Sequence, residues 1–190
     1  MYLKNSFIFI LLVVLSCQPI EILKPANIDP SRFDKISINT KDIEIIKKYK
    51  SVFSKNNIEY QIQNRPIDVI VDWHHKNINK IGNENKLVIN ILDSSISKNE
   101  INNEDAKNYE EKTIFKYEVF YFVEYELYDN SGFLIANTTV ENSRSTTSKK
   151  YISLNETDLI INELLILTML DFVNEAKNQL SNYMSAYVSN

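Results

Sequence analysis

Thr113-Ile-Phe-Lys-Tyr-Glu-Val-Phe-Tyr-Phe-Val-Glu-Tyr-Glu-Leu-Tyr128 is the stretch of this sequence that decides the fold. Every odd-numbered position from Phe115 to Leu127 is apolar or aromatic, whereas the even-numbered positions include Lys116 and three glutamates. Successive side chains of a β-strand point to opposite faces of the sheet. The alternation therefore predicts one long strand with a buried face and a face directed toward water.

The residues after this strand predict that the chain turns back to form a hairpin. Asp129-Asn-Ser-Gly132 has the composition of a turn, because Asp, Asn and Gly accept the backbone conformations that turns require. A second alternating run then follows with Leu134, Ala136, Thr138 and Val140. We expect these two strands to pair with each other. The next tract, Asn142 to Lys150, is polar throughout and predicts an exposed loop.

Two segments have apolar residues at helical spacing. In residues 66–81, Pro66 suits a first helical turn, and Gly82 is a residue that often follows a helix end. The stripe of this segment comprises Ile67, Ile70, Val71, His74, Ile78 and Ile81. The segment 154–185 follows Ser153 and Glu156, which are spaced as a capping box at a helix N-terminus. We expect a helix over each of these two segments.

Shorter strands are predicted on either side of the first helix. Residues 35–40 alternate as a half-buried strand, and the residues from Ile43 through Ile62 are interpreted as its continuation followed by a loop. Residues 86–95 have apolar side chains on both faces, while the polar stretch 97–108 predicts a loop. The order strand, helix, strand, strand, strand, helix predicts an α+β two-layer sandwich. In it, two helices cover a mostly antiparallel four-stranded sheet.

The first seventeen residues predict export. Lys4 precedes nine apolar residues from Phe7 to Leu15, which is the length of a signal-peptide core and too short to span a bilayer. An ordinary cleaved signal requires small residues one and three positions before the cut, and Val14-Leu15-Ser16 meets that pattern only in part. Val14-Leu15-Ser16-Cys17 resembles instead the four-residue box of bacterial lipoprotein signals.

This resemblance implies that residues 1–16 are removed and that Cys17 is lipidated. Cys17 would carry a diacylglycerol, and its new amine would take a fatty acyl chain such as palmitate. Two or more acyl chains hold a protein stably on a bilayer, whereas one chain binds marginally. We therefore expect a signal peptide over 1–16, a lipidated tether over 17–34 and a single domain over 35–190.

Composition argues against several functional classes. The formal net charge is −4, and the one short basic run, Lys47 to Lys50, is too small for nucleic-acid binding. The chain contains only two glycines. The tight glycine-rich loops that hold cofactors are therefore not expected. A nucleophile elbow, a phosphate-binding loop and a zinc-binding spacing are all missing from the sequence. We expect no cofactor and no metal, and we expect that the protein is not an enzyme.

The two histidines are adjacent, so their rings would point about 100° apart on a helix and could not share one metal ion. We expect His74 to lie in the core, His75 at the surface and Trp73 at the edge of the core. The glutamates of the long strand, Glu118, Glu124 and Glu126, are expected on a solvated face of the sheet.

Three residues are candidates for contact with a partner. Phe120 and Phe122 share the charged face of the long strand, and aromatic side chains exposed on such a face would mark a binding patch. A covering loop or helix is the alternative explanation for these two aromatics. Arg144 is the third candidate, because it lies in the polar tract 142–150 and could meet acidic or phosphate groups.

Several segments together resemble a group of small alphaproteobacterial lipoproteins of unknown function. The resemblance is carried by Cys17, Trp73–Gly82, Ile89–Ile96, the Tyr-rich hairpin around Gly132, Arg144-Ser-Thr and the capped final helix. The order of elements is also similar to that of periplasmic α+β lipoproteins that assist outer-membrane assembly. These include the lipopolysaccharide-transport plug lipoprotein and the auxiliary lipoproteins of lipid-transport ABC systems.

These resemblances imply a membrane-anchored periplasmic lipoprotein that acts as a non-catalytic binding or scaffold component in envelope biogenesis or lipid transport. Its partners would be the lipid bilayer and an envelope protein. Gln18 stands where an aspartate would favour the inner membrane, so the outer membrane is expected. The alternative is a carrier of lipid or another small ligand, with a cavity between helix and sheet.

Overall fold

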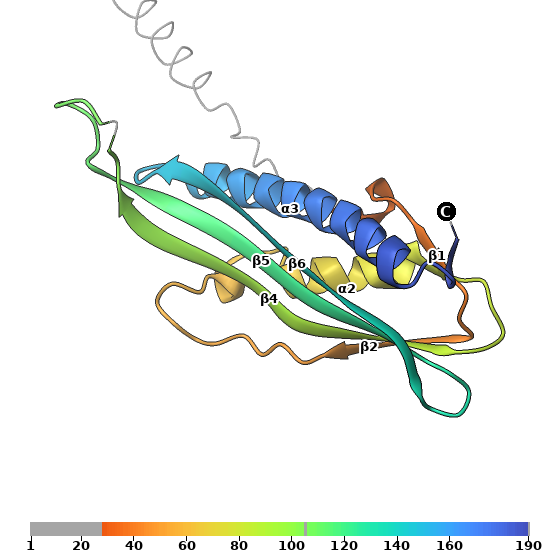
Figure 1. Cartoon of the computed structure of the whole chain (residues 1–190). Coiled ribbons are helices and arrows are strands. Elements are labelled where there is room, and N and C mark those ends of the chain that lie inside the picture. Colours follow the sequence, from red (N-terminus) through yellow and green to blue (C-terminus); the bar gives the residue numbers. More distant parts are fainter. Residues whose placement is uncertain (1–27, 105, 190) are drawn as a thin grey trace, which may run out of the picture.

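The computed structural model describes residues 28–104 and 106–189, which form an α+β fold with two sheets (Figure 1). Helices α2 (Pro66–Asn77) and α3 (Leu154–Tyr183) run along the larger sheet. The larger sheet has the order β2-β4-β5-β6, with β2 (Asp42–Lys47), β4 (Lys86–Asn102), β5 (Thr113–Tyr128) and β6 (Leu134–Lys149). The smaller sheet has the order β3-β1-β7, with β1 (Ile36–Ile38), β3 (Ile78–Lys80) and β7 (Val188–Ser189). Two 3-10 turns, η1 (Pro30–Arg32) and η2 (Glu59–Gln61), complete the described elements.

The predicted fold class is confirmed. In the larger sheet, β2 pairs with β4 in parallel, and β4, β5 and β6 pair antiparallel. The four strands of this sheet and the two helices follow one another along the chain in the predicted order, as β2, α2, β4, β5, β6 and α3. The smaller sheet was not predicted, because its three strands contain only two or three residues each.

Strand β5 has the predicted bounds and the predicted two faces. Its odd-numbered side chains from Tyr117 to Leu127 are at most 1% exposed, and the even-numbered ones between them are half-buried. The turn to β6 is held by Asp129, whose Oδ1 accepts hydrogen bonds from the N–H groups of Ser131 at 2.8 Å and Phe133 at 2.9 Å. Gly132 has a φ of +83°, which glycine adopts without steric cost.

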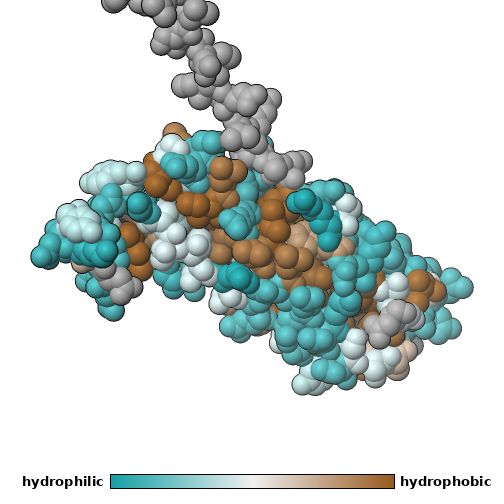
Figure 2. All heavy atoms as spheres, turned by 90° about the horizontal axis from the view of Figure 1, so that it is seen from above, coloured by the Kyte–Doolittle hydropathy of each residue, from teal (hydrophilic) through white to brown (hydrophobic). Residues whose placement is uncertain are grey.

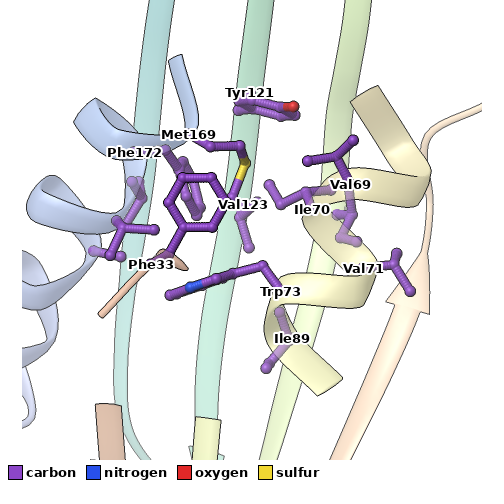
Figure 3. Packing of buried hydrophobic residues seen from close by; sticks show 14 of the residues in the cluster. Phe33, Val69, Ile70, Val71, Trp73, Ile89, Tyr121, Val123, Met169 and Phe172 are labelled. Atoms are coloured by element: carbon purple, nitrogen blue, oxygen red, sulfur yellow. The ribbon is translucent and has the colours of Figure 1, made fainter. Parts of the chain in front are cut away.

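The core lies between the two helices and the larger sheet (Figure 3). Trp73 is fully buried at its centre, so the prediction that it caps the core edge is wrong. Its ring meets that of Phe172 edge-on, with centroids 5.9 Å apart, and its Nε1–H donates to the Asp34 carbonyl at 3.3 Å. The indole takes this central position because it fills the space between α2 and α3 while its one polar group is satisfied.

The prediction that His74 is a core histidine is confirmed, because it is 1% exposed. Its Nδ1 lies 2.7 Å from the Ile70 carbonyl oxygen, which can only accept, so Nδ1 carries the proton. The neutral Nε2 then accepts a hydrogen bond from the Tyr125 hydroxyl at 2.8 Å. Burial lowers the pKa of His74 to about 4. His75 is exposed, as predicted.

The first helix is shorter than predicted. It ends at Asn77, and Ile78–Lys80 form β3, which pairs in parallel with β1. Ile78 is buried in this pairing, whereas Ile81, placed on the predicted helical stripe, is 55% exposed. Gly82 therefore does not end a helix. It lies where the chain passes β1 closely, and a Cβ there would come within 2.9 Å of the Thr40 backbone nitrogen.

Two polar stretches predicted as loops are strands instead. β4 continues through Ser97 to Asn102, and the tract from Asn142 to Lys149 belongs to β6. Both lie along β5, which offers backbone hydrogen-bonding groups over its whole length. Residues 42–47 likewise form β2 in the larger sheet and do not continue β1.

Residues 28–34, which were expected in the tether, pack onto the domain. Ile28 and Phe33 are buried, and Asn77 donates from Nδ2 to the Phe33 carbonyl at 2.6 Å. Asp29 caps η1 by accepting a hydrogen bond from the Ser31 N–H at 3.0 Å. Pro30 suits this turn because its missing N–H would be unpaired there anyway.

The predictions for residues 1–16 and Cys17 lie outside the described residues. Between residues 28 and 189, leaving out residue 105, no helix is long and apolar enough to span a bilayer.

Candidate binding face

The two faces of the larger sheet differ in what covers them. One face packs against α2 and α3, and its central side chains are buried. The other carries the even-numbered side chains of β5 and their neighbours on β4 and β6, and we call it the outer face. Its members on β5 include Lys116, Glu118, Phe120, Phe122, Glu124 and Glu126. In Figure 1, strands β4, β5 and β6 lie in front of α2, and α3 runs beside β6.

Phe120 and Phe122 lie at the middle of the outer face. Phe120 is flanked across the strands by Ser95 and Ser143, and Phe122 is flanked by Asp93 and Glu141. Directly opposed residues in a sheet have Cβ atoms about 5 Å apart, so the side chains of Asp93 and Glu141 begin on either side of Phe122. Both phenylalanines are half-buried, so part of each ring meets solvent.

Two further carboxylates complete this group along β5. Glu118 and Glu124 lie one outer-face position beyond Phe120 and Phe122, respectively. We call the set Asp93, Glu118, Phe120, Phe122, Glu124 and Glu141 the acidic aromatic patch. It presents two aromatic rings among four carboxylates on an extended, regular backbone.

Two lysines of the outer face pair with the carboxylates at the two ends of this patch. Lys116 pairs with Glu118 at 3.0 Å, and Lys48 lies 3.7 Å from Glu124. Asp93 and Glu141 make no ion pair with any residue in the described ranges. The Oδ1 atom of Asp93 is also shielded from solvent and accepts no hydrogen bond there. The negative charge is therefore least compensated beside Phe122.

Asn90 holds two of the carboxylates of the outer face by hydrogen bonds. It is 1% exposed, and its Nδ2 donates to the Oε2 atoms of Glu124 at 3.0 Å and Glu126 at 2.8 Å. One amide therefore holds two carboxylates on neighbouring outer-face positions of β5. Sequence reasoning missed Asn90, although it is the single polar residue within Leu87-Val-Ile-Asn-Ile-Leu92.

A groove of about 610 Å³ lies at the β2 end of the outer face. The residues that line it include Lys41, Lys48, Lys86, Val88 and Asn90. Lys86 pairs with Glu44 at 2.6 Å, which raises the pKa of the Lys86 ammonium through hydrogen bonding and charge. The groove joins the acidic aromatic patch through Asn90 and Lys48.

Arg144 lies on the opposite face of the sheet. It is the β6 partner of the buried Val119, and its Nη1 pairs with Asp171 of α3 at 2.5 Å. It therefore fastens β6 to the long helix. The structure brings Phe120 and Phe122 together but separates Arg144 from them.

The helix side of the molecule is also partly apolar at its surface. Figure 2 looks onto the side where α3 lies, and hydrophobic atoms form a band across it. On α3, Leu159 is 44% exposed and Leu170 is 40% exposed. Acidic residues, including Glu163 and Asp171, lie along the same helix.

The side chains of the outer face offer groups for non-covalent contact. Among the described residues, no three or more His, Cys, Asp or Glu side chains are grouped so that they could hold a metal ion. The face offers carboxylates, aromatic rings and the amide of Asn90. Groups of these kinds can contact another molecule through charge and through aromatic surfaces.

No protein-family model matches the chain, and no curated protein sequence matches it either. Among solved structures, the chain is similar to a minor lipoprotein from Acinetobacter baumannii. That match has 12% identity and a TM-score of 0.41, and it covers 80% of this chain and 98% of that one. A neuraminyllactose-binding hemagglutinin homolog from Helicobacter pylori matches at 10% identity with a TM-score of 0.36, covering 82% and 93%. Both likenesses are weak and concern the arrangement of the backbone alone.

Proposed function

We propose that this protein is a lipid-anchored component of the bacterial envelope that binds a partner protein through the outer face and has no catalytic activity. The observation that carries the proposal is the acidic aromatic patch. Two half-buried phenylalanines stand among carboxylates on a sheet face that no described helix covers. Aromatic side chains are enriched at the energetically important centres of protein interfaces.

The rigidity of the face supports this role. Phe120 and Phe122 belong to β5, which is hydrogen-bonded to β4 on one side and to β6 on the other. Their neighbours on the buried face, such as Tyr121 and Val123, are fully buried. A partner would therefore meet side chains that are already in place, which lowers the entropic cost of binding.

The anchor would hold the outer face close to a membrane. With Cys17 acylated, residues 18–27 would separate the lipid from the first packed residue, Ile28. An extended chain spans about 3.4 Å per residue, so this segment reaches at most about 35 Å. The domain would then work on partners at or near the membrane surface, in the periplasm and on the outer membrane.

The alternative role as a lipid or small-ligand carrier has less support. It needs a cavity between the helices and the sheet, and large side chains fill the centre of that space. Trp73, Tyr121, Tyr125 and Phe172 are each fully buried there. Their rings pack against one another or against His74 at centroid distances of 4.7 to 6.2 Å. A cavity of about 230 Å³ lies at the end of that space, between the start of α3 and strands β4 and β5.

Site-specific photo-crosslinking in cells that produce the full chain would test the proposal. A photoreactive phenylalanine analogue at position 120 should capture an envelope protein reproducibly. The same analogue at Leu170, on the helix side, serves as the matched control and should not capture that protein. If neither Phe120 nor Phe122 yields a crosslinked protein while the chain is folded and membrane-bound, the outer face is not the binding face.

A further inference from the structure

The outer face has a charge pattern that selects the chemistry of its partner. Asp93 and Glu141 flank the Phe122 ring on its two sides, and neither pairs with a cation among the described residues. Lys48 and Lys116 pair instead with the outer carboxylates of the patch, and Lys86, farther along this face, pairs with Glu44. The centre of the patch therefore combines a half-buried aromatic ring with two carboxylates that make no ion pair among the described residues.

A cationic side chain satisfies both features at once. A lysine or arginine placed over an aromatic ring within about 6 Å of its centre is attracted by the ring. Carboxylates on both sides of that ring would pair with the same cation. This chain already places an ammonium over aromatic rings, because the Lys98 Nζ atom lies 3.9 Å from the centre of the Phe115 ring.

We propose that the outer face binds a basic segment of its partner, with a lysine or arginine over Phe122 and between Asp93 and Glu141. This inference rests on the proposed function, since it names the partner chemistry of the same face. Ser95 and Ser143, which flank Phe120, are small enough to leave that neighbouring ring open to the apolar part of the same segment. Asn90 donates a hydrogen bond to Glu124 at the edge of the patch.

The helix side is a weaker candidate for this partner. Leu154, Leu159 and Leu170 of α3 are exposed, but Asp171 on this helix is already paired with Arg144. Its acidic residues are spread along the helix and do not bracket a ring.

Peptide binding to the full chain in an uncharged detergent would test the inference. The probes are three fluorescent peptides of equal length, in which serine alternates with arginine, with glutamine or with glutamate. Fluorescence anisotropy should show that the arginine peptide binds and that the other two do not. Raising the salt concentration from about 50 to about 300 mM should weaken this binding, because exposed charges are screened.

Substitutions in the patch locate the binding site. The double variant Asp93→Asn/Glu141→Gln should weaken arginine-peptide binding by about tenfold or more. The double variant Asp72→Asn/Glu163→Gln removes the same charge from the two helices and should bind as the unchanged protein does. Equal weakening by both double variants would mean that net charge alone attracts the peptide, and would overturn the inference.

Substitutions of the ring separate cation binding from apolar contact. Phe122→Leu keeps an apolar side chain but removes the aromatic face, so binding should fall by about fivefold. Phe122→Tyr should retain binding, and both variants should keep the unchanged circular dichroism spectrum. If Phe122→Leu binds as well as the unchanged protein, no cation lies over the ring. If crosslinking from Phe120 captures a partner but the arginine peptide does not bind, the basic-segment inference fails while the proposed function stands.

Discussion

His74 is kept neutral in the folded protein by its position in the core. Its ring is buried, and both nitrogens are satisfied, one by the Ile70 carbonyl and the other by the Tyr125 hydroxyl. Burial lowers its pKa from the ordinary 6.5 to about 4. Between these two values the unfolded chain binds a proton that the folded chain excludes, so the free energy of unfolding must fall as the pH falls.

This coupling gives a pH prediction. The contribution of neutral His74 to the free energy of unfolding is complete above about pH 6.5 and is lost as the pH falls toward 4. Each pKa unit corresponds to about 1.4 kcal/mol, so between pH 6.5 and pH 5 the protein should lose about 2 kcal/mol from this group. Urea unfolding at these two pH values measures the loss.

Two histidine variants control this measurement. His75→Gln removes the exposed neighbour and should leave the pH dependence unchanged. His74→Leu removes the buried group, so its stability should be lower at pH 7 but nearly independent of pH over the same interval. An unchanged slope in His74→Leu would show that other groups cause the acid sensitivity.

Asn90 gives a second prediction for a single residue. Asn90→Asp would place a third carboxylate beside Glu124 and Glu126, at a position that is 1% exposed. An unpaired buried charge is strongly destabilising, so we expect a loss of about 3 kcal/mol at pH 7. Urea unfolding would measure it, and much of the loss should be regained near pH 4, where carboxylates become protonated. A variant as stable as the unchanged protein at pH 7 would mean that the amide does not hold the two glutamates.

Individual elements differ in how well the sequence predicts them. Elements specified by their own residues are predicted well, and elements that depend on pairing with a distant strand are not. β5 is predicted residue by residue, because its alternation is complete within the strand itself. Helix α3 is predicted from its start, because Ser153 and Glu156 form the capping box through local hydrogen bonds. The ends of β4 and β6 are not predicted, because their polar residues become strands only by pairing with β5.

The same distinction applies to the first helix and to the candidate site. Residues 78–80 continue a helical pattern of apolar residues, and only the pairing with β1 makes them a strand. Phe120 and Phe122 are found from the sequence because they interrupt a charged strand face. Asp93 and Glu141 are not, because their place beside Phe122 depends on the register of three strands and on the irregularity between Ile91 and Asp93.

The capping box at the start of α3 should stabilise the folded protein. The Ser153 hydroxyl accepts the Glu156 N–H at 3.2 Å, and the Glu156 carboxylate accepts the Ser153 N–H at 2.9 Å. Ser153→Ala removes one of these caps and should lower the free energy of unfolding by about 1 kcal/mol. Ser153→Asp, which can still cap, should retain most of the stability. Chemical denaturation measures both, and equal losses in the two variants would show that the cap does not stabilise the helix.

Across the whole molecule, the proposed lipid tether and the proposed binding face lie on different sides of the larger sheet. The described chain begins at Ile28, where η1 packs against α2 on the helix side of the sheet. The acidic aromatic patch lies on the other side of the same sheet. A tether that enters on the helix side would leave the outer face free to meet a partner while the lipid holds the protein in place.

The lipid anchor itself is the prediction that tests this arrangement as a whole. Replacing residues 1–16 with an ordinary cleavable signal, together with Cys17→Ser, removes the acylation site but keeps export. The folded domain should then move from the membrane to the soluble fraction, because a stable hold on a bilayer requires two or more acyl chains. Fractionation with an antibody against the domain measures this, and the unchanged chain, labelled with radioactive palmitate, serves as the control. If the variant stays in the membrane fraction after a high-salt wash, the domain contacts the membrane by itself. Cys17 would then not be what holds the outer face near its partner.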